Sequence, residues 1–266
     1  TIVTFQGADI QIQKKINYGY RLDKKYDVLL KKVIKKVDLI QAISKTIYKD
    51  LIKLNINQKK IVIIPNSINL SKFKLKKRRN KRLNLITVAR FAEKKKGYDF
   101  ISKISSLLVN KVNFKWTLVG RGVSNIKNYN FVSKNLKYFK LVEEIGHNNE
   151  NYFPNSRLIN LYKNSDLYLH LSRIESFGVS IIEAMASGLP VLSFKSKGSS
   201  ELIKNKINGF QIDNFNIKKF AKKIIFISKY EKLFAKRKKI RSSVKTYDLK
   251  SNTNKLIGCY RKLNTF

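Results

Sequence analysis

The chain has 266 residues, and its 57 Lys and Arg residues against 17 Asp and Glu give a formal net charge of +40. The length suits one large domain or two smaller ones, and 43% hydrophobic residues are enough for a buried core. The single cysteine, Cys259, excludes a disulfide framework within the chain. No apolar run approaches the ~18–20 residues that span a bilayer. We expect a protein of a reducing, cytoplasmic compartment.

The positive charge has two interpretations. It is typical of proteins that bind nucleic acid or an anionic membrane. It also fits a coding bias towards Lys, Ile, Asn, Tyr and Phe, because the excess runs along the whole chain. We favour the bias and expect no specific nucleic-acid partner. Such a charge would still attract anionic ligands and the inner face of an anionic membrane.

Residues 1–75 alternate the patterns of strands and helices. Strands are expected over residues 1–7, 38–44 and 60–66. The first predicted helix covers residues 21–37, and its expected buried side chains are Leu22, Tyr26, Leu29, Val33 and Val37. Ser44 is expected to cap a second helix. This order predicts a parallel α/β sheet of about three strands, which we expect to be the second half of an N-terminal domain.

A longer α/β unit follows a basic linker at residues 76–82. Its predicted strands cover residues 83–90, 114–120, 138–145, 167–172, 190–195 and 209–212. Helical patterns cover residues 98–109, 156–164, 178–187, 199–205 and 216–229. The alternation predicts a doubly wound domain over residues 83–245. Residues 246–266 read as a C-terminal helix, and His170 is expected to be a packed strand residue.

The stretch "ESFGVSIIEAMASG" at residues 175–188 is the candidate ligand site. Ligands of doubly wound sheets bind where strands end and helices begin. Here Ser176 is expected to be the N-cap of a helix, and the free amides of Gly178, Val179 and Ser180 would attract an anion.

Charged side chains surround this predicted anion site. Glu175 and Glu183 are placed to accept hydrogen bonds from hydroxyl groups of a ligand, although the spacing alone also fits ordinary surface charges. Arg90 ends a strand, and Lys95 and Lys96 precede Gly97 at the start of a helix. These cations would neutralise a diphosphate.

The block "SRIESFGVSIIEAMASGLPVLSFKSKGSSELIKNKINGF" at residues 172–210 resembles the donor-site signature of retaining glycosyltransferases of family 4, which have the GT-B fold. The stretches "VARFAEKKKGYDF" and "LVGRG" resemble further parts of that family, and so do "AISKTIYKDL" and "KIVIIPNSINLSKF". These similarities follow the family's order along nearly the whole chain. The resemblance implies two Rossmann-like domains, of which the first is only partly present.

The resemblance also implies roles for individual residues. Arg90 and Lys96 would contact the donor diphosphate, and Lys95 is not cleanly separable from Lys96. Glu175 would hold hydroxyls of the donor sugar, and Glu183 would hold the ribose. The remaining donor contacts would be the backbone of Phe177, Gly178, Val179 and Ser180, with Gly146 and His147 near the base.

Two departures from the family pattern concern the acceptor. Many members have His where this chain has Gln6, next to Gly7, and Gln cannot act as a base. These two residues would lie on the acceptor or donor side of the cleft. The first half of the N-terminal domain is expected to be missing or supplied by a separate chain, and the remaining sheet would have an open edge.

We therefore predict an enzyme that moves a hexose from a UDP- or GDP-linked sugar to a hydroxyl of a glycan or lipid-linked acceptor. Retention at the anomeric carbon, no metal and no cofactor are expected, with a role in polysaccharide or lipopolysaccharide biosynthesis. Two alternatives are a silent remnant that binds only nucleotide and a basic protein of membrane or nucleic-acid surfaces. Nucleotide binding without sugar turnover would favour the remnant.

Overall fold

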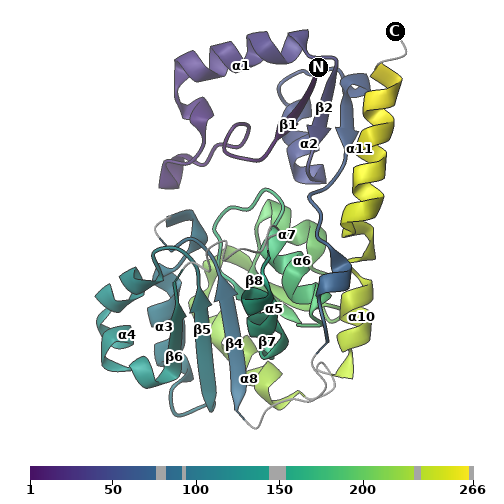
Figure 1. Ribbon diagram of the computed structural model, residues 1–266. Coiled ribbons are helices and arrows are strands. Elements are labelled where there is room, and N and C mark those ends of the chain that lie inside the picture. The colour runs from purple at the N-terminus through teal and green to yellow at the C-terminus, as the bar shows by residue number, and fades with distance from the viewer. Residues whose placement is uncertain (76–81, 92–93, 144–153, 231–234, 264–266) are drawn as a thin grey trace.

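The computed structural model describes residues 1–75, 82–91, 94–143, 154–230 and 235–263. Two all-parallel sheets lie one above the other, each flanked by helices (Figure 1). Within the described ranges, the upper sheet has three strands in the order β1-β2-β3. The lower sheet has six strands in the order β6-β5-β4-β7-β8-β9. The prediction of α/β architecture with Rossmann-like sheets is therefore confirmed. The domain limits remain a prediction.

The upper sheet contains β1 (Ile2–Phe5), β2 (Leu39–Ala42) and β3 (Ile61–Ile63). Helix α1 (Lys24–Lys36) joins the first two strands, and α2 (Lys45–Ile52) joins the last two. Ser44 is the N-cap of α2, as predicted, because its hydroxyl accepts a hydrogen bond from the amide of Ile47 at 3.0 Å.

The predicted buried face of α1 is wrong in the middle of the helix, although Val37 at its C-terminal end is buried as expected. Leu29 and Val33 are 60% and 46% exposed, whereas Leu30 and Ile34 are 8% and 3% exposed. Both pairs have the helical spacing of four residues, so periodicity alone does not choose between them. Leu30 and Ile34 are the pair that packs into the core, and Leu29 and Val33 form an apolar stripe on the outward face of α1.

The lower sheet contains β4 (Leu83–Val88), β5 (Phe114–Val119), β6 (Phe139–Val142), β7 (Leu167–His170), β8 (Val191–Phe194) and β9 (Gly209–Ile212). The helices of this part are α3 (Asp99–Leu108), α4 (Asn130–Lys134), α5 (Ser156–Lys163), α6 (Val179–Ala186), α7 (Lys197–Leu202) and α8 (Ile217–Lys229). Helices α3, α4 and α8 bury apolar side chains against one face of the sheet, and α5 and α6 cover the other. This places two layers of helices around the sheet, as in a doubly wound domain.

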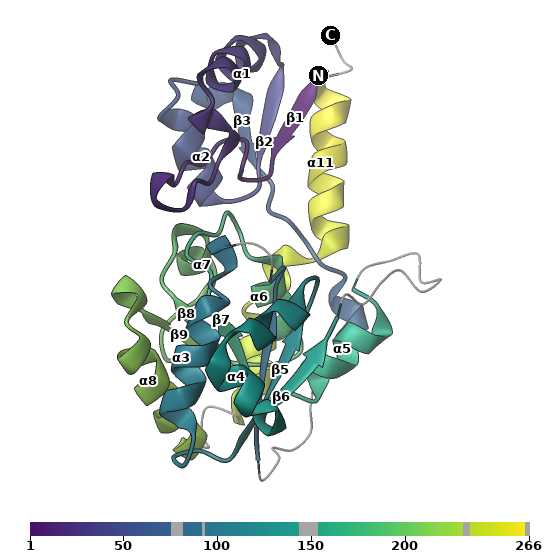
Figure 2. The same ribbon diagram turned by 90° about the vertical axis from the view of Figure 1, so that its left-hand side faces the viewer.

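The last two helices connect the two sheets. Helix α10 (Arg237–Ser242) packs against α6, and α11 (Leu249–Leu263) runs beside the upper sheet in both views (Figures 1 and 2). Ile68, which follows β3, donates its amide to Tyr247 and accepts from Leu249, both at 3.0 Å. The chain therefore crosses between the two sheets twice, once before β4 and once before α11.

Candidate active site

The site predicted from the sequence lies at the carboxyl ends of β4 and β7, which are neighbours in the lower sheet. The loop after β7 leads into α6. Gly178 is the N-cap of α6, with φ of 107°, and a Cβ there would come within 2.8 Å of the Ile181 side chain. Glycine is therefore required for this entry into the helix. The first amides of α6 have no acceptor within the helix, and they face the space beyond its end.

The prediction that Ser176 caps α6 is wrong. Its hydroxyl donates to Oε1 of Gln11 at 2.8 Å, and its carbonyl accepts from the Ser44 hydroxyl at 2.7 Å. Both partners belong to the part of the chain that carries the upper sheet. Ser176 therefore joins the two halves of the molecule instead of capping a helix.

Glu175 lies in a cationic setting. Its side chain is 14% exposed, and its Oε2 lies 2.9 Å from Nζ of Lys96 and 3.4 Å from Nε2 of His170. Burial opposes ionisation of Glu175, but the charge of Lys96 outweighs it, with a smaller contribution from the nearby His170, and holds its pKa well below the usual range. Glu175 is thus a carboxylate at neutral pH, able to accept further hydrogen bonds.

Glu183 has a different environment. It is 2% exposed on α6, and its Oε2 accepts a hydrogen bond from the Tyr162 hydroxyl at 2.8 Å. Its Oε1 has no hydrogen-bond partner among the described groups. Burial raises the pKa of Glu183 to about 7, and the bond from Tyr162 offsets only part of that effect. The two glutamates of the motif are therefore held in different protonation states near neutral pH.

The three predicted cations lie around this edge of the sheet in different ways. Lys96 pairs with Glu175, and Nζ of Lys95 lies over the Tyr18 ring, 4.5 Å from its centroid. Arg90 is exposed, two residues after β4. The structure therefore brings Lys96 to the carboxylate, while Lys95 turns towards the part of the chain that carries the upper sheet.

Backbone contacts fix the loop that carries Lys96. Gly97 has φ of 67°, and a Cβ there would lie 2.2 Å from the Leu171 carbonyl oxygen. The Arg173 amide donates to the Lys95 carbonyl at 2.7 Å, and the Arg173 guanidinium forms two bonds to Asp99 at 2.7 and 2.6 Å. The loops after β4 and β7 are thereby locked together, which sets the distance between Lys96 and Glu175.

Gln6 and Gly7 lie where the two halves of the molecule approach each other. A Cβ on Gly7 would lie 1.9 Å from the Ser176 hydroxyl oxygen. The exposed Gln6 accepts a hydrogen bond from the Asn66 amide at 3.2 Å. Gly7 therefore permits close approach of the two halves, and Gln6 presents an amide at their junction.

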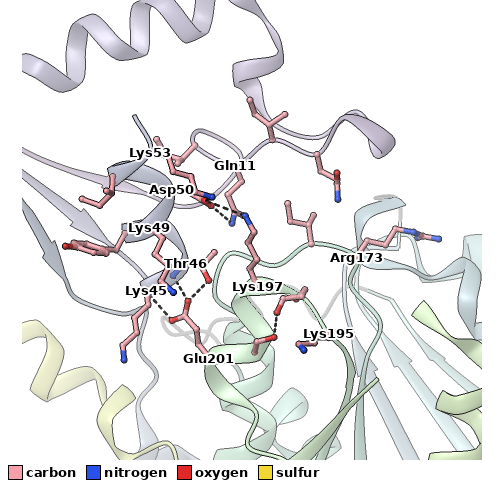
Figure 3. A pocket seen from close by; sticks show the side chains of 18 of the residues that line it. Gln11, Lys45, Thr46, Lys49, Asp50, Lys53, Arg173, Lys195, Lys197 and Glu201 are labelled. Carbon is pink, nitrogen blue, oxygen red and sulfur yellow. Dashed lines mark hydrogen bonds and ion pairs between the residues drawn. The ribbon is translucent and has the colours of Figure 1, made fainter. Parts of the chain in front are cut away.

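Other functional candidates carried no clear sequence signal. Glu201 on α7 accepts hydrogen bonds from the Lys45 amide at 2.9 Å and from the amide and hydroxyl of Thr46 (Figure 3). This carboxylate thus caps α2 across the junction. The expected packing of His170 is confirmed at 4% exposure, but its approach to Glu175 was missed. A histidine at a strand end, five residues before an acid, was the only available hint.

Two predicted donor contacts, Gly146 and His147, lie outside the described residues. Over the part of the chain that the structure describes, no group of three His, Cys, Asp or Glu side chains is arranged to hold a metal ion. None of the described helices has both the length and the apolar character needed to cross a membrane.

Comparisons with known proteins identify the family and the fold of the chain. The family model described as "Glycosyl transferases group 1" matches residues 69–246. An uncharacterized glycosyltransferase of Haemophilus influenzae is 29% identical over 192 residues, covering 70% of this chain and 50% of that protein. The UDP-Gal:alpha-D-GlcNAc-diphosphoundecaprenol alpha-1,3-galactosyltransferase of Escherichia coli is 25% identical over 191 residues, covering 66% of this chain and 47% of that protein. The chain spans about half the length of these two relatives.

The solved structure of sucrose-phosphate synthase from Thermosynechococcus elongatus superimposes with a TM-score of 0.82, covering 99% of this chain and 68% of that one. At 18% identity this likeness establishes the fold alone, and it agrees with the GT-B prediction. The family model, which covers about two thirds of the sequence, establishes more: the chain belongs to the group 1 glycosyl transferases.

Proposed function

We propose that the protein moves a hexose from a UDP- or GDP-linked sugar to a hydroxyl of a glycan or lipid-linked acceptor, with retention at the anomeric carbon. The observation that carries this proposal is the ion pair of Lys96 and Glu175, 2.9 Å long, beside the glycine-led start of α6. An ammonium, a carboxylate and free helix amides in one place suit a ligand that carries both phosphate and hydroxyl groups.

In this proposal the diphosphate binds at the start of α6. The backbone amides of residues 177–180 and the positive end of the helix dipole would hold its oxygens. Lys96 would turn from Glu175 towards the phosphate, and Arg90 would approach from the end of β4. Because charge develops on the leaving diphosphate, these donors stabilise the transition state more than the ground state.

Glu175 and Glu183 would hold the two sugars of the donor. Glu175 is ionised before the donor arrives, so it is ready to accept hydrogen bonds from hexose hydroxyls. Glu183 has one carboxyl oxygen without a partner among the described groups, which a ribose hydroxyl would satisfy. The base would lie near Gly146 and His147.

Retention requires no basic side chain at the junction in this proposal. Gln6 cannot remove a proton, so the departing phosphate oxygen would take the proton of the acceptor hydroxyl on the same face of the sugar. Gln6 would contribute a hydrogen bond to the reacting groups. The side chains that act directly are then Lys96, Arg90 and Glu175.

The acceptor and the place of action belong to the same proposal. One relative's name specifies a lipid-linked diphosphate acceptor, and a net charge of +40 would draw this chain to an anionic membrane surface. The remaining acceptor contacts would come from chain beyond the described residues or from a separate chain that completes the upper sheet.

Calorimetric titration with UDP, GDP and their hexose derivatives tests the donor site. We expect Lys96→Ala to weaken binding of the preferred nucleotide about tenfold, through loss of one charge-assisted contact. The matched control is Lys218→Ala on the exposed face of α8, which should leave affinity unchanged. Equal affinities for the wild type and Lys96→Ala would contradict the site.

Turnover separates the enzyme from a remnant that only binds nucleotide. We expect release of nucleoside diphosphate from the preferred donor, and a loss of about 10²–10³-fold in that rate for Glu175→Gln. Nucleotide binding without any release of hexose from the wild type would favour the remnant.

A further inference from the structure

A cavity lies between the two halves of the molecule, apart from the proposed donor site (Figure 3). Its volume is about 1210 Å³, and its walls come from residues 10–13, from α2, from Arg173 and Ile174, and from residues 195–201. Among the donor residues that the structure describes, none lines this cavity. The contacts of Ser176 with Gln11 and Ser44 form the boundary next to it.

The walls of this cavity are strongly cationic. Seven of its 21 lining residues are Lys or Arg, and two are acidic. Both acids already have partners: Glu201 accepts hydrogen bonds from the start of α2, and Asp50 lies 3.6 Å from Nζ of Lys197 and accepts from Gln11 at 3.3 Å. Acids outside the lining pair with three further cations of the wall, which are Arg21, Arg173 and Lys195, and Lys53 also approaches Asp50. Among the described residues, the unpaired positive charge of the wall therefore comes from Lys45 and Lys49, and a concave surface focuses that field.

Two lysines of the wall stand out. Lys45 and Lys49 are exposed, one turn apart on α2, and neither side chain forms an ion pair within the described ranges of the chain. Figure 3 shows them with Lys53, Lys195 and Lys197 around the same hollow. Two lysines one turn apart, with no carboxylate partner in the described part of the chain, are suited to bind phosphate or carboxylate groups of a ligand.

We propose that this cavity binds an anionic saccharide through its phosphate or carboxylate groups, and that this saccharide is the acceptor chain. The identification as acceptor rests on the proposed function. Ile174 of the cavity wall is followed in the chain by Glu175, so a saccharide held in the cavity would lie beside the loop that carries the donor-site carboxylate. Apolar lining side chains such as Tyr48 and Phe215 offer surfaces for sugar rings. A hollow between two halves fits a chain better than a flat bilayer.

The test compares two variants that remove the same charge. Lys45→Ala/Lys49→Ala removes two lysines of the cavity at a spacing of four residues. Lys218→Ala/Lys222→Ala removes two exposed lysines of α8 at the same spacing and far from the cavity lining. The probes are an oligogalacturonate, its neutral methyl ester, a hexose phosphate, and vesicles with and without phosphatidylglycerol. UDP and GDP are titrated in parallel.

We expect the oligogalacturonate or the hexose phosphate to bind the wild type, and the cavity variant to bind it about tenfold more weakly. The α8 variant should lose less than twofold, the neutral ester should not bind, and nucleotide affinity should stay constant in both variants. Equal losses in the two variants, or binding of the neutral ester, would overturn the proposal. The proposal would also be overturned if the protein bound anionic vesicles but neither saccharide probe, and if that binding were lost in Lys45→Ala/Lys49→Ala. Saccharide binding with no nucleotide binding would refute the donor site and leave the cavity as an anion site.

Discussion

Replacing Glu183 by Gln should stabilise the protein at pH 8 much more than at pH 5. Glu183 is 2% exposed, and the Tyr162 hydroxyl is the one donor to it among the described groups. Burial raises its pKa to about 7, from an ordinary value of 4.5. In the unfolded chain the carboxyl ionises freely above that ordinary value, whereas in the folded chain it keeps its proton until about pH 7.

The size of the effect follows from linkage between protonation and folding. A raised carboxyl pKa lowers stability as the pH rises from 4.5 to about 7, and the loss is constant above that. At ~1.36 kcal/mol per pKa unit, the full cost is about 3 kcal/mol at pH 8 and about 1 kcal/mol at pH 5. Gln at this position does not ionise, so the variant should escape this cost. The fit of its amide adds an offset that does not depend on pH.

Urea unfolding of the wild type and Glu183→Gln at pH 5, 6, 7 and 8 measures this difference. The free-energy gap between the two proteins should grow by about 2 kcal/mol over that range. Glu143→Gln, the same change at an exposed glutamate, should show no such growth. A gap that stays constant with pH would refute the argument that burial keeps Glu183 protonated.

Three further changes probe the contacts around the site, each by urea unfolding. Lys96→Met should lower the free energy of unfolding by about 1–3 kcal/mol at pH 7, because it leaves the Glu175 carboxylate without its ammonium partner. Adding Glu175→Gln should restore most of that loss. Additive losses in the double variant would contradict the pairing. Gly178→Ala should cost about 1–3 kcal/mol, because φ is 107° and the Ile181 side chain is 2.8 Å from the new Cβ; a neutral effect would contradict the left-handed cap. Glu201→Ala should lower the free energy of unfolding by about 1–2 kcal/mol, because the first amides of α2 lose their acceptor. Glu201→Gln should lower it by less, because the side-chain amide oxygen can still accept a hydrogen bond. Equal losses in these two variants would argue against the hydrogen bonds.

The sequence was most informative where one local rule acted alone. The strands of the lower sheet and the cap at Ser44 follow from apolar runs and backbone geometry that need no distant partner. The face of α1 did not follow, because Leu29 with Val33 and Leu30 with Ile34 fit the same period. The choice between them depends on how the helix lies on the sheet, which is a tertiary property.

The candidate site was predictable in composition but not in its contacts. The motif indicated that Glu175, Glu183 and Lys96 belong together. Their separate environments depend on the adjacency of β4 and β7 and on the burial of α6 against α5. Ser176 shows the same limit: its hydroxyl is a good helix cap by type, but Gln11 lies within 2.8 Å and takes its hydrogen bond.

The different states of the two glutamates lead to a last prediction about donor binding. Hydrogen bonds from ribose hydroxyls to Glu183 favour its ionised form, because a carboxylate is a stronger acceptor than a carboxylic acid, and Glu183 in the free protein has a pKa of about 7. Binding of a UDP- or GDP-hexose at pH 6.5 should therefore release a fraction of a proton, and affinity should rise from pH 6 to pH 8. A nucleotide sugar has no ionisation of its own in this range, because both phosphates are esterified.

Calorimetry in two buffers with different ionisation enthalpies measures that proton directly. The wild type should show a difference in apparent binding enthalpy between the buffers, and Glu183→Gln should show none. Glu175, already ionised beside Lys96, should contribute nothing to the release. If the wild type binds the donor with no proton exchanged at pH 6.5, Glu183 stays protonated against Tyr162 in the complex and does not accept from the ribose. The donor would then be held by the α6 amides, Lys96 and Glu175, with Glu183 a buried structural acid.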